Sequence, residues 1–247
     1  MTHRPSLHGA DWLAELRALA LADESLQAYL DKLATAAKEW VPEATSCAVR
    51  VRYGNRVLTA VTDELLRGLT EDGTGEGPEA SAWGDGGWQR VDDLCRDDRW
   101  PEFGRRACSA GLRSVLVATL VTREGRTIGT VGFWSTSVDA FGRSAEAAAA
   151  GFVEEAGSAV DLALAVAHGV EVNQDLHRAL ATRSVIDQAV GVIMAEDRCS
   201  PEAAFETLRR ASMNRNIKVH RLAADIVRGV SGKPPSDPPF TARSFPG

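Results

Sequence analysis

The chain has 247 residues, of which 44% are hydrophobic and 25% are charged, and its formal net charge is -6. These values are typical of globular proteins and leave room for one large domain or two smaller ones, of which we expect two. The longest apolar stretches fall far short of the roughly 20 residues that a membrane-spanning helix needs, and the N-terminus lacks an apolar signal segment, so we expect no membrane partner and a cytoplasmic location.

The cysteines and histidines give no sign of a metal centre. No C-x-x-C or H-x-x-x-H spacing occurs, which argues against a structural zinc site and against a disulfide framework. No G-x-S-x-G motif is present, and no histidine falls between His8 and His168, so the first half lacks the commonest general base. We therefore expect no metal, no cofactor and no enzymatic activity. We expect reduced thiols at Cys47, Cys95, Cys108 and Cys199.

The first half begins with a predicted helix over residues 23–40, where leucines recur at helical intervals. Two pairs of predicted strands follow, at 46–53 with 55–62 and at 114–122 with 127–135, each pair joined by a short polar turn. Strands close in sequence and joined by short turns form antiparallel sheets. The predicted fold class is α+β, an antiparallel sheet flanked by helices.

Between the strand pairs lies a loop-rich stretch, residues 71–88. Its glycine-rich part, residues 73–87, lacks the G-K-[ST] ending of a phosphate loop and is predicted to be a flexible lid. An acidic cluster follows it, for which ion pairs and helix caps are favoured over binding of a hard cation. Four aromatic residues in this part either line a small-molecule cavity or fill the core. The acidic residues are Asp92, Asp93, Asp97 and Asp98, and the aromatic ones are Trp83, Trp88, Trp100 and Phe103.

From Ala145 onward the pattern is helical for more than fifty residues. Part of this helix carries a weak heptad seam, with an asparagine at an a position, which favours a parallel homodimer through the helix; packing on its own domain is the alternative. The seam residues are Leu162, Val166, Gly169, Asn173, Leu176 and Leu180.

The charged residues are distributed unevenly along the chain. Residues 1–167 carry 17 Lys and Arg against 25 Asp and Glu, whereas residues 198–233 carry eight against three. No acid occurs from Thr207 to Ala224, although this stretch contains five cations. An acidic module therefore precedes a basic one, which is the pattern of a polyanion-binding segment.

The end of the long helix and two further helices, joined by short loops, are predicted to form a small bundle with a mostly cationic outer face. Ser200 and Pro201 mark the start of the second, as N-cap and first-turn proline. The second helix is expected to bury Ala204, Phe205, Leu208 and Ala211, and the third Val219, Leu222, Ala223, Ile226 and Val230. Gly191, in the helix before them, is expected to mark the close approach of another helix.

Residues 176–227 resemble the ANTAR domain, the RNA-binding antitermination module of bacterial regulators. The resemblance covers the run Arg183-x-x-Ile186-x-Gln188-Ala189-x-Gly191-x-x-Met194, the run Glu202-Ala203-x-Phe205-x-x-Leu208-Arg209, and Asn214-x-Asn216-x-Lys218. The first half resembles the GAF domains that precede ANTAR in actinobacterial regulators, through "TDELLRGL", "VDDLCRDDRWPEF" and "GLRSVLVATLVTREGRTIGTVGFWS".

The resemblances imply an N-terminal segment 1–20, a GAF-like sensor domain 21–165, a connecting coiled-coil helix 166–182, an ANTAR domain 183–231 and a disordered tail 232–247. The implied function is a signal-responsive antitermination regulator that binds hairpins in nascent RNA; a DNA-binding regulator that senses a small molecule is the alternative. Cations would hold phosphates, while asparagine and glutamine amides would read unstacked loop bases. Two second interpretations stay open: one of the adjacent residues Arg209 and Arg210 packs or pairs internally with Glu206, and Asn216 is the N-cap of the third helix. The candidate RNA-binding residues are Arg183, Gln188, Arg209, Arg210, Asn214, Arg215, Asn216, Lys218 and Arg221.

Overall fold

The computed structural model describes residue 18 and residues 25–70, 76–85 and 87–233. The chain divides into two compact units, Met1–His168 and Gly169–Gly247. The predicted N-terminal segment and C-terminal tail lie outside the described residues, apart from Ala18, Gly232 and Lys233. Within the described part, no helix is both long and apolar enough to span a bilayer.

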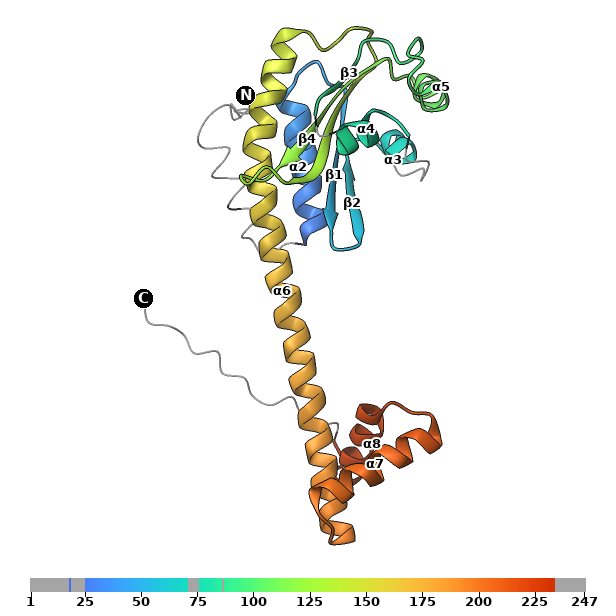
Figure 1. The fold of residues 1–247 in the computed structure, drawn as a ribbon, viewed down its shortest axis with the longest axis vertical. Helices are drawn as coiled ribbons and strands as arrows, with labels where there is room; N and C mark the ends of the chain where they lie inside the picture. The colour runs from blue at the N-terminus through green and yellow to red at the C-terminus, as the bar shows by residue number, and fades with distance from the viewer. Residues whose placement is uncertain (1–17, 19–24, 71–75, 86, 234–247) are drawn as a thin grey trace, which may run out of the picture. The chain divides into compact units, whose positions relative to one another are not determined.

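The first unit is built on a five-stranded antiparallel sheet with the strand order β2-β1-β5-β4-β3 (Figure 1). Both predicted hairpins are present, and Gly54 supplies the positive φ that the turn of the first one requires. The strands are β1 (Ser46–Tyr53), β2 (Arg56–Val61), β3 (Gln89–Val91), β4 (Ser114–Val121) and β5 (Thr127–Ser135).

Helices cover both faces of this sheet (Figure 1). One face packs against α2 (Leu26–Trp40) and the first part of α6 (Arg143–Asp197), and the other against α3 (Glu64–Thr70), α4 (Pro78–Asp85) and α5 (Pro101–Ser109). Side chains alternate between the two cores as the pleat requires, so Cys47 and Val49 of β1 lie in the first core and Ala48 in the second. The predicted α+β class and antiparallel sheet are confirmed.

The glycine-rich stretch is not a loop throughout, and the prediction of a lid is wrong for its central part. Pro78 occupies the first position of α4, where a missing backbone N–H costs nothing, and Ala82 is fully buried in the second core. Burial of one helical face therefore overrides the turn signals of the surrounding glycines. Residues 71–75 and 86 lie outside the described residues.

The second unit contains the end of α6 together with α7 (Pro201–Arg215) and α8 (Val219–Ser231). Ser200 caps α7 as predicted, since its side chain accepts a hydrogen bond from the backbone N–H of Ala203 at 3.3 Å. Seven buried residues from the three helices form the core: Ala189, Ile193, Ala204, Leu208, Leu222, Ala223 and Val227.

Three expectations about this core are wrong. Phe205 is 41% exposed because it lies at the edge of the apolar stripe of α7, and the small bundle covers only the centre of that stripe. Val230 is 65% exposed and lies in the last turn of α8, which ends at Ser231. Gly191 marks no close approach of another helix: an added Cβ there would find nothing within 4 Å.

Candidate nucleic-acid interface

All nine predicted RNA-binding residues belong to the second unit, and all nine are exposed. Arg183 and Gln188 lie on α6, and Arg221 lies on α8. The other six follow one another along α7 and the turn after it: Arg209, Arg210, Asn214, Arg215, Asn216 and Lys218. Helix α7 and its C-terminal turn therefore carry most of the candidate surface.

The inner face of α7, formed by Ala204, Leu208 and Ser212, faces the core and leaves its cations in solvent. Arg209 and Arg210 are adjacent and so point about 100° apart around the helix axis. The guanidinium of Arg209 lies 3.5 Å from the carboxylate of Glu206, one turn earlier, and both side chains are more than half exposed. Such a surface pair contributes little to stability, so Arg209 remains free to exchange a carboxylate for a phosphate.

The turn between α7 and α8 has a specific geometry centred on Asn216. This residue adopts the left-handed conformation, with φ 51° and ψ 40°, and ends α7. Its N–H bonds to the carbonyl of Met213, and the N–H of Ile217 bonds to the carbonyl of Ser212 at 3.1 Å, which together form a Schellman motif. The interpretation of Asn216 as N-cap of the third helix is therefore wrong. Lys218 takes that position, without a side-chain cap.

The Gln188 amide is available for other partners. Its Nε2 donates to the hydroxyl of Ser184, one turn earlier on α6, at the long distance of 3.4 Å. A ligand that offers a shorter hydrogen bond would compete with this contact at little cost.

The four aromatic candidates of the first unit have different surroundings. Phe103 is buried, and the centroid of its ring lies 5.9 Å from that of Trp134. Trp100 is partly buried against the same core. The Arg52 guanidinium covers the ring of Trp83 at 5.2 Å, whereas Trp88 is 45% exposed. None of the four lines the cavity of about 760 Å³ beside α5.

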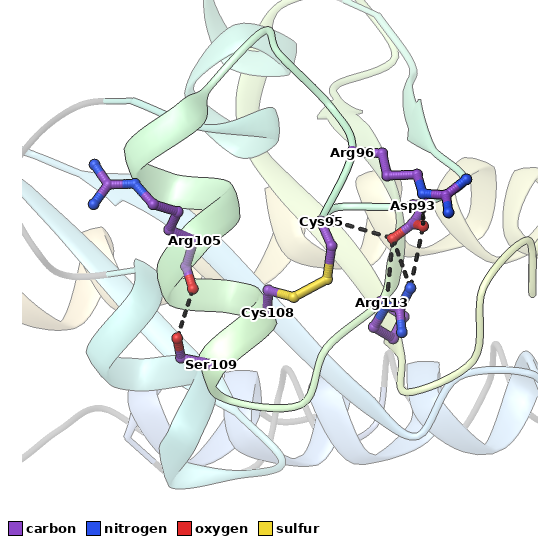
Figure 2. The surroundings of a disulfide bond; sticks show 7 residues. All are labelled: Asp93, Cys95, Arg96, Arg105, Cys108, Ser109 and Arg113. Atoms are coloured by element: carbon purple, nitrogen blue, oxygen red, sulfur yellow. Dashed lines mark hydrogen bonds and ion pairs between the residues drawn. A yellow bond between two sulfur atoms is a disulfide. The ribbon is translucent and has the colours of Figure 1, made fainter.

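That cavity lies beside a feature that the sequence did not predict, a disulfide between Cys95 and Cys108 (Figure 2). The expectation of reduced thiols is wrong for this pair, because α5 turns the chain back and brings the two Cα atoms to 5.5 Å. The expectation holds for Cys47 and Cys199, which are free.

Three residues of the acidic cluster form ion pairs, the role favoured from the sequence over binding of a cation. Figure 2 shows Asp93 accepting hydrogen bonds from the guanidinium of Arg113, at 3.1 Å, and from the backbone N–H of Cys95. Asp92 pairs with Arg90, and Asp97 with Arg99. Among the described residues, no group of three or more His, Cys, Asp or Glu is placed to hold a metal ion.

A second feature that the sequence did not predict is the buried carboxyl of Glu79 on α4. Burial, only partly offset by the Arg50 guanidinium at 3.4 Å, raises the pKa of Glu79 to about 7. Glu79 Oε1 and the indole N–H of Trp134 are buried without a hydrogen-bond partner. A Cβ at position 132 would lie 2.9 Å from that Oε1 and 2.8 Å from that indole nitrogen, so any side chain there would displace Glu79 and Trp134.

Part of the second unit is similar to a known domain family. Residues 174–227 match the ANTAR domain family. The match begins within α6 and ends within α8, so the ANTAR domain includes every predicted RNA-binding residue. The predicted lower boundary of 183 lies inside the matched range.

No curated protein matches the chain. Three of the solved structures similar to it are the free methionine-R-sulfoxide reductase of Neisseria meningitidis in complex with its substrate, fRMsr of Staphylococcus aureus in reduced form, and the GAF domain of an Acinetobacter phosphoenolpyruvate-protein phosphotransferase. Their identities are 18%, 15% and 16%, and each has a TM-score of 0.45. The alignments cover 61%, 65% and 65% of this chain and 87%, 99% and 95% of the other chains.

Proposed function

We propose that this protein is a cytoplasmic, signal-responsive transcription antitermination regulator whose ANTAR domain binds hairpin loops in nascent RNA. The observation that carries the proposal is the coincidence of the ANTAR match with the exposed, cation-rich surface of α7 and its C-terminal turn. No covalent chemistry is required, and the chain acts as a binding protein rather than as an enzyme.

The chemistry of this surface suits single-stranded RNA loops. Exposed guanidinium and ammonium groups contact phosphates regardless of sequence, which gives affinity without selectivity. The amides of Gln188, Asn214 and Asn216 each offer a donor and an acceptor to base edges. Loop bases are unstacked and expose those edges, whereas the deep, narrow major groove of duplex RNA does not admit side chains.

The chain acts as a homodimer through α6 in this proposal. Of the heptad residues, Leu162 packs partly against the core of the first unit, but Leu176 and Leu180 are 59% and 52% exposed. Two apolar side chains of this size, one helical turn apart on one face, are suited to bury each other against a second copy. Two RNA-binding modules tethered in this way would also bind paired hairpins more tightly than one.

The first unit is proposed to be a GAF-like sensor, whose signal is a small molecule bound within it. The partly buried Trp83 and Trp100, with Trp88 and Phe103, remain the proposed ligand contacts. Native mass spectrometry of the purified protein tests this part, since a co-purified small molecule would be detected as an added mass.

The proposal is tested by fluorescence anisotropy on the full chain with a hairpin library of constant stem and randomised loop. A preference for selected loops over duplex DNA at matched salt supports RNA binding, and a preference for duplex DNA would favour the alternative of a DNA-binding regulator. Replacing Lys218 and Arg221 together by Ala should weaken binding to all RNAs. The slope of the logarithm of the binding constant against the logarithm of the salt concentration should become shallower by roughly 0.7 to 0.9 for each phosphate that is no longer neutralised. Replacing Arg56 and Arg123, two exposed cations of the first unit, is the matched control and should change neither.

A further inference from the structure

A groove runs between α6 and α7 within the second unit. Its volume is about 500 Å³, and its lining includes Ala179, Ile186 and Phe205, with Arg178 and Arg183 beside them. The groove lies wholly inside the range matched by the ANTAR family. It combines an apolar floor, one aromatic ring and two guanidinium groups with the hydroxyl of Thr182 and the carboxylate of Asp187.

Phe205 is a large apolar residue of this groove that the bundle leaves partly exposed. The spacing of apolar residues on α7 predicts burial, yet 41% of Phe205 is exposed while Ala204 and Leu208 beside it are buried. An aromatic ring left facing water forgoes the stabilisation that burial would give. A ring in that position is suited to a ligand that covers it only when bound.

The arginines at the groove are held only by weak contacts. Arg178 pairs with Asp175 at 3.1 Å and Arg183 with Asp187 at 3.9 Å, both within about one turn of α6, and all four side chains are more than two-thirds exposed. Exposed ion pairs of this kind contribute little to stability. Both guanidiniums can therefore leave their carboxylates for a phosphate diester backbone that presents several oxygens.

We propose that this groove binds one unstacked nucleobase of a single-stranded RNA loop, with the base stacked on the ring of Phe205 and Arg178 and Arg183 on the flanking phosphates. The inference rests on the proposed RNA-binding function and adds to it a specific contact outside the α7–α8 turn. Every base has a π-face, so stacking contributes affinity for unpaired nucleotides with little dependence on sequence. Selectivity then comes from the amides at the turn.

The charge of the groove favours RNA over a second copy of this chain as the occupant. On a helix with 3.6 residues per turn, Ala179 and Ile186 lie about 90° around the α6 axis from Leu176 and Leu180, the proposed dimer seam. A second copy seated on the leucines would therefore leave Ala179 and Ile186 uncovered, whereas Arg183, three residues after Leu180, lies on the seam side of the groove. The guanidiniums at its edge also match a polyanion better than an apolar partner helix.

The test uses the full chain, the selected hairpin RNA and four variants. Phe205→Ala and Phe205→Leu remove the ring, Phe205→Trp replaces it with a larger one, and Val230→Ala is the control, since Val230 is 65% exposed on α8 and lies outside the groove. Removing the ring should weaken binding by about 5- to 150-fold, the range that loss of base–aromatic stacking spans, whereas Phe205→Trp and Val230→Ala should bind as the wild type does. Hairpins with 5-iodouridine at single loop positions should photocrosslink to the peptide containing Phe205.

The outcomes separate this inference from the proposed function. A wild-type chain that shows no preference for hairpin loops would refute the function itself. Normal loop binding by Phe205→Ala and Phe205→Leu, with crosslinks elsewhere, would refute the base site alone. A change from dimer to monomer in Phe205→Leu, measured by light scattering, would assign the groove to a contact between copies and would also overturn the inference.

Discussion

Substitutions of Asn216 can separate an effect on folding from an effect on RNA binding, because the backbone of this residue ends α7 and its side-chain amide is a candidate contact to RNA. The left-handed conformation at φ 51° is tolerated by asparagine and favoured by glycine, whereas a Cβ without a compensating polar group is strained there. Asn216→Ala should therefore lower the free energy of unfolding by about 1 kcal/mol, and Asn216→Gly should change it by less than about 0.5 kcal/mol. Both substitutions remove the amide.

The assay combines urea unfolding with anisotropy titration of the selected hairpin and of a loop-scrambled hairpin. If the amide reads a loop base, Asn216→Gly keeps its stability but loses about 1–3 kcal/mol of affinity for the selected loop, and loses almost none for the scrambled one. A glycine variant that binds the selected loop as the wild type does would show that Asn216 serves only to end α7. Equal losses for both RNAs would likewise refute base reading.

Three further predictions concern other parts of the chain. Burial raises the pKa of Glu79 to about 7 in the folded state, against 4.5 for the free side chain, so the free energy of unfolding should fall by up to about 3 kcal/mol as pH rises between these values. Glu79→Gln should remove this pH dependence, which urea unfolding across pH 4–8 measures. A variant with the same pH profile as the wild type would contradict the assignment. Cys95→Ser should lower the free energy of unfolding by about 3 kcal/mol under oxidising conditions. Thiol titration in denaturant without reductant should find three thiols in this variant and two in the wild type. Four thiols in the unreduced wild type would refute the disulfide. Leu176→Lys should convert a dimer into a monomer in light scattering without altering thermal unfolding of the first unit, and a variant that stays dimeric would remove α6 as the interface.

The sheet could be predicted because its signals are local. Each hairpin consists of two apolar strands and a short turn, and the alternation in β1 assigns Cys47 and Val49 to one face and Ala48 to the other. Helix α4 could not be predicted in the same way. Its glycine-rich surroundings dominate the local pattern, and only the tertiary burial of Ala82 and Glu79 on its inner face reveals why the segment is helical.

The candidate surface was predictable as a set of residue types, and its geometry was not. Charge counting and motif spacing located the cations, but they did not show that Asn216 ends α7 in the left-handed conformation, with hydrogen bonds back to the last turn of that helix. The disulfide joins residues 13 apart, a separation with no recognised motif, and forms because α5 reverses the chain. Phe205 fits the apolar periodicity of α7, and only the narrow contact area of a three-helix bundle explains why it is left exposed.

Recognition of RNA by the second unit through unpaired loop bases can be tested by a competition titration. The full chain is bound to a labelled hairpin selected from the loop library, and unlabelled competitors that share its stem sequence are added at fixed salt. We expect the identical hairpin to displace the label at far lower concentration than the loop-scrambled hairpin, the stem closed as a continuous RNA duplex, or the same duplex in DNA. Displacement by all four competitors at similar concentrations would show binding to phosphates alone and would contradict loop recognition.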